Sequence, residues 1–237
     1  GGGAPTSTRE TACVLVREGR RALLLDVGSG VRRLLPAASA LDGIEHVDVV
    51  LSHFHFDHVC GLPFLQWLDL DVTIWGPGSW LYDTPSAEIL GALRSPPISP
   101  NDISGWPLEE LREGEQSISG FALRASAQPH HWAPSAGLRV GDELAYVTDT
   151  PYESSSVELA RGVRHLLHEA WSTSTASKYA DRDATAADAG RVAREADVGK
   201  LALIHLDPDF DDLRALEEDG RTLFDAVVVA EDGLELT

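Results

Sequence analysis

The most constraining feature of this sequence is a run of metal-binding residue types that directly follows an apolar strand. The strand is predicted over Val47–Ser52, and the six residues after it read His-Phe-His-Phe-Asp-His. Three imidazoles and one carboxylate at this spacing are typical of metal ligands. His53 and His55 lie two apart in extended chain and can share one ion, whereas Asp57 and His58 lie over the following turn and can reach a second. The ordinary alternative, a set of exposed polar residues on a loop, gives this cluster no packing purpose.

The rest of the chain alternates short apolar runs with helical patterns, and no low-complexity linker separates them. The runs are rich in Val, Leu and Ile and are bounded by Gly, Pro, Asp or Ser, which predicts strands. The other predicted strands are Ala12–Val16, Ala22–Asp26, Val72–Trp75, Phe121–Ala127, Leu144–Thr148, His165–His168, Leu201–His205 and Ala226–Val229. Helices are predicted over Val31–Ala38, Ser79–Arg94 with a break at Thr84-Pro85, Ala184–Ala196 and Asp209–Asp219, and a surface loop over Ser95–Gly105. This order predicts an α/β chain in which helices cover sheets.

Composition narrows the class of protein. A chain of 237 residues with 43% hydrophobic residues can bury the core of one domain, expected over residues 1–237. No apolar run approaches the roughly 20 residues of a membrane-spanning helix. With 19 Lys+Arg against 38 Asp+Glu, the net charge of −19 argues against a broadly basic nucleic-acid surface. The two cysteines cannot build a disulfide framework, which fits a reducing cytoplasm. The first residues, three glycines without a preceding Met, are interpreted as a loop, and a strand trimmed from in front of them stays an open alternative.

The histidine-rich run, followed by Gly61-Leu62-Pro63, resembles the first metal motif of the metallo-β-lactamase-fold hydrolases. The Gly-Leu-Pro continuation resembles the branch that contains ribonuclease Z and cyclic phosphodiesterases. Further segments match the family in order along the chain: the turn Asp26-Val27-Gly28-Ser29-Gly30, His131 six residues before Gly137, Thr148-Asp149-Thr150, His205 at a strand end, and a closing hairpin at Ala230-Glu231-Asp232-Gly233. The resemblance implies a four-layer αββα sandwich and a hydrolase.

The resemblance also implies a site with two divalent metal ions. Zinc suits the mixed nitrogen and oxygen ligands, and manganese or iron are alternatives. The implied ligands are His53, His55 and His131 for the first ion, Asp57, His58 and His205 for the second, and Asp149 as a bridge between them. The preferred reaction is attack of a metal-bridging hydroxide on a phosphodiester, with Asp57 as a catalytic residue that accepts a proton from the water. Taken alone, His205 would be a core histidine and Asp149 a turn residue.

Two positions bear on proton transfer. His168-Glu169-Ala170-Trp171 resembles the strand-end His-Glu-Ala-Thr segment of the ribonuclease Z branch, and His168 is a candidate catalytic residue on that ground. Asp183 stands where that branch has a His that assists the leaving group. Either Asp183 caps the helix that follows, the favoured interpretation, or it is a protonated carboxyl group that acts as a general acid.

The substrate is expected to be small. Only 18 residues separate His131 from Asp149, which leaves no room for the long basic arm with which ribonuclease Z clamps transfer RNA. A net charge of −19 also disfavours a polyanionic partner. The alternatives are hydrolysis of a lactone, ester or thioester at the same metals, or a non-catalytic metal-containing binding or accessory protein. Trp132, with Phe54 and Phe56, either lines the mouth of the site or packs on a loop. A homodimer is a common outcome for such enzymes.

Overall fold

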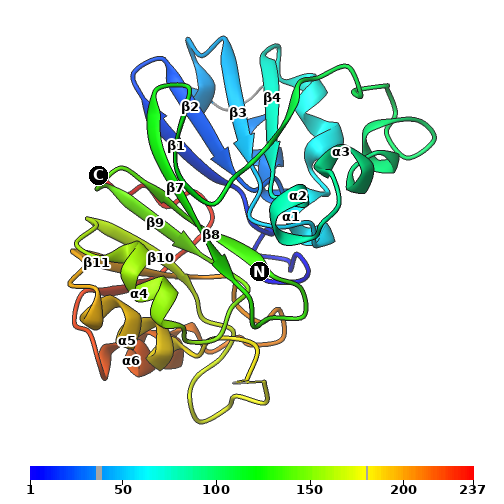
Figure 1. The fold of residues 1–237 in the computed structure, drawn as a ribbon. Coiled ribbons are helices and arrows are strands. Elements are labelled where there is room, and N and C mark those ends of the chain that lie inside the picture. The colour runs from blue at the N-terminus through cyan, green and yellow to red at the C-terminus, as the bar shows by residue number, and fades with distance from the viewer. Residues whose placement is uncertain (36–38, 180) are drawn as a thin grey trace.

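A computed structural model describes residues 1–35, 39–179 and 181–237, and its strands form two sheets that pack face to face (Figure 1). The first sheet has the order β1-β2-β3-β4-β5 and the second the order β12-β11-β10-β9-β8-β7-β6. The first sheet comprises β1 Val14–Glu18, β2 Arg21–Leu25, β3 His46–Val50, β4 Asp71–Gly76 and β5 Leu108–Glu110. The second comprises β6 Gly114–Ile118, β7 Phe121–Gln128, β8 Ser135–Val140, β9 Leu144–Val147, β10 His165–Glu169, β11 Lys200–Ile204 and β12 Val227–Val229.

Each sheet is apolar on both faces. In β2, the buried Leu23 and Leu25 contact the second sheet, whereas Leu24 faces the outer layer of the molecule. In β9, Tyr146 faces the first sheet and Val147 faces outward. Successive residues of a strand point to opposite faces, so continuous apolar strands need cover on both sides. The α/β fold and its four αββα layers are therefore confirmed.

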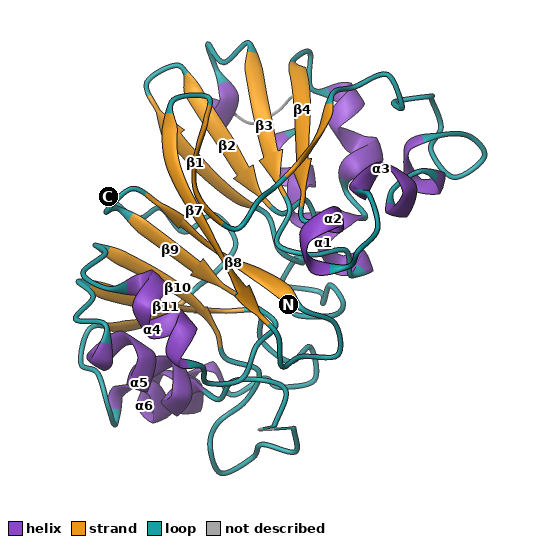
Figure 2. Cartoon of the chain, in the orientation of Figure 1, coloured by secondary structure: helices purple, strands orange, loops and turns teal. Residues whose placement is uncertain are grey.

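Helices supply the two outer layers (Figure 2). The outer face of the second sheet is covered by α4 Ser154–Ala160, α5 Ala186–Glu195 and α6 Leu213–Arg221. Shorter turns lie by the first sheet: η1 Ser29–Leu34, η2 Ser39–Leu41, α1 Phe56–Val59, η3 Leu62–Trp67, α2 Gly78–Leu81, α3 Ser86–Ile89 and η4 Ala92–Arg94. No helix in the described ranges is long and apolar enough to span a bilayer.

The predicted strands all form, with ends shifted by one or two residues, and the predicted helices need several corrections. The expected helix Val31–Ala38 is the 3₁₀ turn η1, and residues 36–38 lie outside the described ranges. Helix α5 begins at Ala186, because Thr185 is its N-cap. Helix α6 begins at Leu213 rather than at Asp209, because Asp212 accepts the Ala215 N–H at 3.0 Å and caps it. The break at Thr84-Pro85 separates α2 from α3 and is confirmed, but α3 ends at Ile89, and Ala92–Arg94 forms the separate 3₁₀ turn η4.

Other elements were not predicted. Strands β5, β6 and β8 and helix α4 form in segments that carried no assigned element. The closing hairpin at Ala230–Gly233 is wrong as predicted. A turn forms there, with the Leu234 N–H on the Glu231 carbonyl, but the preceding strand β12 runs parallel to β11, and no described strand follows the turn.

Candidate metal centre

Three residues at the ends of strands bring the site together. Asp26 follows β2, His205 follows β11, and Asp149 lies just beyond β9, so both sheets contribute. Their φ angles are 58°, 49° and 54°, which makes them three of the six non-glycine residues with positive φ in the described ranges. Such left-handed backbone is uncommon outside glycine and clusters at functional sites. The strands therefore end abruptly at the positions where polar side chains are needed.

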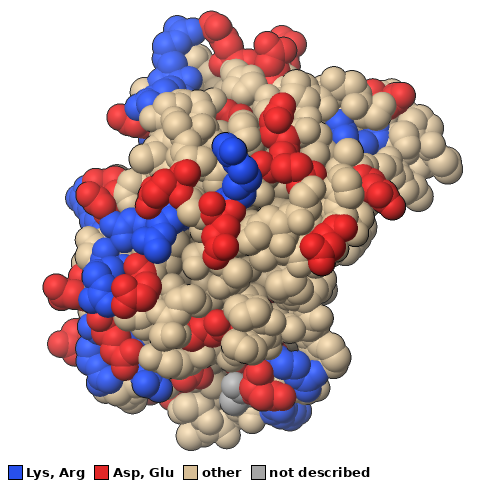
Figure 3. All heavy atoms as spheres, viewed as in Figure 1, with Lys and Arg blue, Asp and Glu red and all other residues tan. Residues whose placement is uncertain are grey.

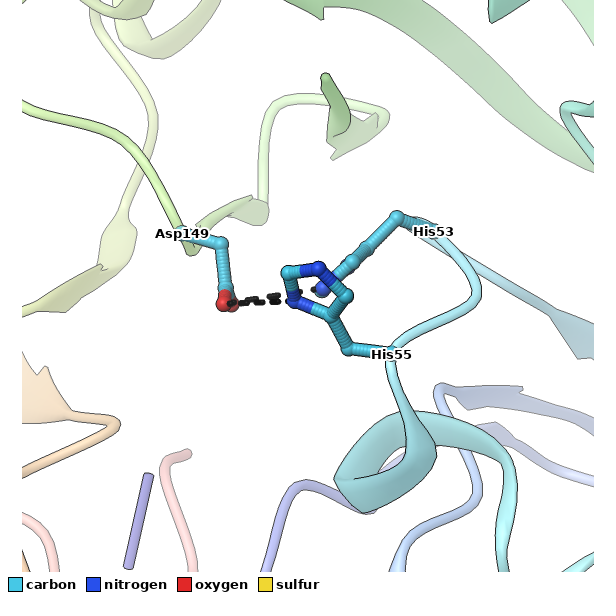
Figure 4. A group of neighbouring side chains, drawn as sticks. All are labelled: His53, His55 and Asp149. Atoms are coloured by element: carbon cyan, nitrogen blue, oxygen red, sulfur yellow. Dashed lines mark ion pairs between the residues drawn. The ribbon is translucent and has the colours of Figure 1, made fainter. Parts of the chain in front are cut away.

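One oxygen of Asp149 faces three imidazoles. Its Oδ1 lies 3.5 Å from His53 Nε2, 3.8 Å from His55 Nδ1 and 3.6 Å from His131 Nε2. Figure 4 shows His53 and His55 directed at this carboxylate from the loop between β3 and α1. His53, His55 and Asp149 form the tighter part of the group, and His131 joins it from the loop before β8.

The other oxygen of Asp149 faces the second set of predicted ligands. Its Oδ2 lies 3.2 Å from His58 Nε2 and 3.4 Å from His205 Nε2. Asp57 Oδ2 lies 3.2 Å from each of the same two nitrogens. The structure thus places the other six predicted ligands around the carboxylate of Asp149, with one set at each of its oxygens.

The geometry of the donors fits metal ions better than hydrogen bonding. Distances of 3.5 to 3.8 Å at Asp149 Oδ1 are too long for hydrogen bonds. Ligand atoms around a tetrahedral zinc ion, each about 2.0–2.1 Å from it, stand roughly 3.3 Å apart. His53 Nε2 is buried and has no hydrogen-bond partner in the described part of the chain, although it points at the carboxylate. The chemistry of these donors fits divalent metal.

Asp26 supports the site from beneath. Its Oδ2 accepts hydrogen bonds of 2.7 Å from His58 Nδ1, the Tyr146 hydroxyl and Ser52 Oγ, and its Oδ1 accepts the Ser52 N–H. Burial would raise the pKa of Asp26, but His58 and the hydrogen bonds outweigh burial and lower it. A carboxylate on Nδ1 fixes the ring so that Nε2 faces the other ligands. Tyr146 was missed, because an inward-facing Tyr on an apolar strand gives no sign of its partner.

A glycine segment near the N-terminus also borders the site. The Gly3 N–H donates to Asp57 Oδ2 at 2.9 Å. A Cβ atom at Gly2 would stand 2.7 Å from His205 Nδ1 and 2.7 Å from Trp171 Cζ3, too close for any side chain. Gly2 is therefore required for the chain to pass beside His205. The sequence offers only the run of glycines as a signal, and such a run is typical of a loop.

The strand-end His-Glu pair is placed differently from our expectation. His168 and Glu169 are consecutive in β10, so they point to opposite faces. His168 lies on the face covered by α5, where burial lowers its pKa to about 4, and its Nδ1 contacts the Glu169 carbonyl at 2.8 Å. Its placement does not support a catalytic role. Glu169 is the member that lies near Asp149 and His205, and burial followed by the charge of Asp149 raises its pKa well above the ordinary value. Strand alternation is the signal that would have selected Glu169.

Asp183 contacts a predicted ligand rather than capping a helix. Its Oδ1 lies 3.1 Å from His131 Nδ1, which also lies 3.1 Å from the Arg182 carbonyl oxygen. The favoured interpretation, a cap on α5, is wrong. Thr185 accepts the Asp188 N–H, and the Asp188 carboxylate accepts the Thr185 N–H. Asp183 holds the His131 ring with Nε2 toward Asp149. Burial lowers the pKa of His131, but the contacts with Asp183 and Asp149 outweigh burial and raise this pKa above its ordinary value.

Comparison with known proteins agrees with this geometry. Residues 21–206 match the family described as the beta-lactamase superfamily domain. The chain is 25% identical to ribonuclease Z of Methanosarcina mazei over 291 aligned positions, which cover 100% of this chain and 95% of that enzyme. It is 27% identical to the probable metallo-hydrolase YhfI of Bacillus subtilis, with 98% of this chain and 94% of that protein covered.

Solved structures show the same fold. The crystal structure of the metallo-beta-lactamase fold protein YhfI from Bacillus subtilis aligns with a TM-score of 0.80 at 23% identity, over 98% of this chain and 94% of that one. A diphosphatase from the PhnP family aligns with a TM-score of 0.71 at 20% identity, over 95% and 83% of the two chains. The chain belongs to the beta-lactamase superfamily. Within it, the chain is a metal-dependent hydrolase of the branch similar to ribonuclease Z.

Proposed function

We propose that this chain is a dinuclear metal phosphodiesterase that acts on a small substrate. The observation that carries the proposal is the placement of Asp149, whose two oxygens each face a separate set of nitrogen and oxygen donors. His53, His55 and His131 would hold one ion, Asp57, His58 and His205 the other, and Asp149 would bridge them. Zinc is favoured by the imidazole-rich donor set. When bound, two such ions supply Lewis-acid stabilisation of a phosphoryl group and lower the pKa of water.

The protein groups around the site fix the protonation states that such chemistry needs. Burial opposes ionisation of Asp57, but hydrogen bonds from His205 and His58 prevail and hold its pKa below the ordinary range. Asp57 is therefore a carboxylate, the form that a metal ligand needs, and we propose that it also accepts a proton from an attacking water once its contacts with His58 and His205 give way to metal. Asp183 faces His131 as a hydrogen-bond acceptor, so we propose that it orients this ligand and does not protonate the leaving group. A substrate with a good leaving group follows from that assignment.

Three features support a small substrate rather than transfer RNA. The interval from His131 to Asp149 is filled by β8 and β9, which pair as an antiparallel hairpin. The 291 positions aligned with the archaeal ribonuclease Z exceed the 237 residues here, so that enzyme has segments without a counterpart in this chain. On the face shown in Figure 3, acidic side chains are interspersed with the basic ones, and no continuous basic surface is visible there.

We also propose a cytoplasmic location for the protein. Cys13 and Cys60 are both free, which supports this location.

The test combines metal content with turnover. Purified protein loaded with zinc or manganese should hold two equivalents of metal, as the seven donors imply, and should hydrolyse bis(p-nitrophenyl) phosphate. The variant Asp149→Asn should lose metal and activity together. A protein that holds both metals and turns over no phosphodiester would overturn the proposal.

A second candidate is hydrolysis of a lactone or thioester at the same metals. It is favoured by Asp183, because its engagement with His131 leaves no identified acid for the leaving group, and a thiolate or a metal-stabilised alkoxide leaving group needs less help from an acid. Faster turnover of a thiolactone than of any phosphodiester would select it. A metal-containing protein that hydrolyses neither would instead match the binding or accessory alternative.

A further inference from the structure

Arg182 lies at the rim of the candidate site and is held there through its backbone. Its carbonyl oxygen lies 3.1 Å from His131 Nδ1, and the next residue, Asp183, contacts the same nitrogen. On the far side of Asp183, the Ala184 carbonyl accepts the Trp171 N–H at 2.9 Å. The backbone at Arg182 is thus fixed relative to a proposed metal ligand, and its side chain starts at the edge of the site.

The guanidinium group of Arg182 lies against two aromatic rings. Its Cζ is 4.0 Å from the ring centre of Trp132 and 5.2 Å from that of Tyr179. Trp132 is 72% exposed and Tyr179 is 44% exposed, so neither ring belongs to the core. Trp132 directly follows His131 in the chain. The two rings hold the cation in place by cation–π contact, which gives Trp132 a position that loop packing alone does not explain.

Stacking leaves the hydrogen-bonding edge of this guanidinium available. Its N–H groups lie in the plane of the group, at right angles to the faces that contact the rings. Its Nε is buried, has no hydrogen-bond partner among the described residues and forms an ion pair with the Asp181 carboxylate at 3.7 Å, so the edge left for a ligand is the one that Nη1 and Nη2 form. By contrast, Arg9 and Arg94 donate to backbone carbonyl groups and brace loops.

We infer that Arg182 binds an anionic group that the substrate carries in addition to the bond being cleaved. The inference rests on the proposed function, because it assumes that the reacting group is held at the metals. The planar pairs of N–H donors match a carboxylate or a phosphate, which accept two parallel hydrogen bonds. In a chain with a net charge of −19, a cation fixed beside the site gives an oxyanion a positively charged partner. Arg182 is thereby assigned as a residue that determines substrate specificity.

Equilibrium binding to the zinc-loaded protein tests this without any turnover. The ligands are ω-phosphonocarboxylates of increasing chain length and alkylphosphonates of the same lengths, which lack the second anion. The wild-type protein should bind a phosphonocarboxylate of suitable length about 10-fold to 100-fold more tightly than its matched alkylphosphonate. Arg182→Gln should remove this preference and leave alkylphosphonate affinity within about twofold. Arg182→Lys should keep part of it, because the charge remains but the two-pronged geometry does not.

Arg191 provides the matched control. It stacks on Tyr152 at 3.9 Å in the same manner, but it donates to Glu195 within α5. Arg191→Gln should keep the full preference. The inference is overturned if the wild type shows no preference at any length, if Arg182→Gln weakens both ligands equally, or if Arg191→Gln has the same effect. A parallel series of α,ω-diphosphonates distinguishes a phosphate from a carboxylate as the preferred second anion.

The outcomes separate this inference from the proposed function. Turnover of phosphodiesters without any second-anion preference overturns only the role of Arg182. A clear preference that depends on Arg182, in a protein that hydrolyses no phosphodiester, overturns only the proposed reaction.

Discussion

At the scale of single residues, the site depends on carboxylates that burial would normally neutralise. Asp26 is fully buried, and it remains ionised because four donors from three side chains and one backbone amide converge on it. Removing one donor from a buried charge costs more than the hydrogen bond contributes, since the charge is left without a partner. Residues that touch no metal ligand directly can therefore govern metal affinity.

Substitution of Tyr146 tests whether a hydrogen-bond donor to Asp26 governs metal affinity. Tyr146→Phe removes the hydroxyl that donates to Asp26 at 2.7 Å and should lower the free energy of unfolding by about 2 kcal/mol. Because Asp26 orients His58, zinc affinity should also fall, by about tenfold. Urea unfolding and competitive zinc titration measure the two effects. Tyr152→Phe is the control, since its hydroxyl bonds the exposed Glu195, and it should change neither quantity appreciably.

Gly2 tests the close approach of the chain to His205. In Gly2→Ala the new methyl group would have to displace His205 or Trp171, both within 2.7 Å. We expect weaker binding of one of the two zinc equivalents, by about tenfold or more, because ligand orientation sets affinity. Gly105→Ala is a fair comparison, since a Cβ atom there meets no atom within 4 Å. Unchanged binding of both equivalents in Gly2→Ala would contradict the role assigned to this glycine.

His168 makes a prediction about pH. Burial lowers its pKa to about 4, below the value near 6.5 of an exposed imidazole. As pH falls below 6.5, His168 takes up a proton in the unfolded chain, whereas in the native protein it stays neutral until about pH 4. Stability from this group is therefore complete above pH 6.5 and declines toward pH 4, by about 2 kcal/mol between pH 6.5 and 4.5. His168→Gln should remove this part of the decline, measured by urea unfolding with a chelator present.

The exposed His130 supplies the comparison for that measurement. His130→Gln should keep the same pH dependence as the wild type. If His168→Gln declines as steeply as the wild type, the group is not buried in its neutral form.

At the scale of elements, the segment between β10 and α5 links the helix layer to the site. The segment is anchored at its end by the capping box of Thr185 and Asp188, and Ser172 bridges to Thr185. Just before this anchor, Asp183 and the backbone of Arg182 contact His131. A defect at the cap and a defect at Asp183 should therefore have different consequences, although the residues are only two apart.

Paired variants separate the two roles. Thr185→Ala should lower the free energy of unfolding by about 1 kcal/mol, the usual effect of losing an N-cap. Asp183→Asn should leave stability nearly unchanged and weaken binding of one zinc equivalent, because the amide is a poorer partner for His131 Nδ1. Urea unfolding and zinc titration of both variants give the comparison. Loss of helix stability in Asp183→Asn would restore the cap interpretation.

At the scale of the whole molecule, the sandwich and the gathering of the predicted ligands at one place were within reach of the sequence. Apolar strands followed by Asp or His mark a sheet edge, and the ordered series of motifs identified the family. Glu169 was not found, because a resemblance selects segments and does not say which face of a strand a residue occupies. The cap at Thr185 was missed because Asp183 and Thr185 are both good capping residues, and tertiary contact with His131 decided between them. Strand β8, with Gly137 inside it, lacked a clear strand pattern.

The site joins the two sheets, which also meet through apolar packing and through hydrogen bonds such as that from Tyr146 to Asp26. His53, His55, Asp57 and His58 come from the first sheet side, whereas Asp149 and His205 follow strands of the second. Any cation held by both groups is a cross-link between the halves of the fold. Ligands that bind only the native state stabilise it in proportion to the logarithm of their concentration over Kd, about 4 kcal/mol at a thousandfold excess.

Metal removal should therefore weaken the connection between the two sheets at the site. A chelator should lower the melting temperature, and backbone amides near Asp26 and Asp149 should exchange with deuterium faster, while those within α5 change least. An equal increase in amide exchange rates throughout the chain would argue against a local cross-link at the site. The lifetime of the folded protein in a cell would then follow the supply of metal, so that a shortage would remove the protein itself as well as its activity.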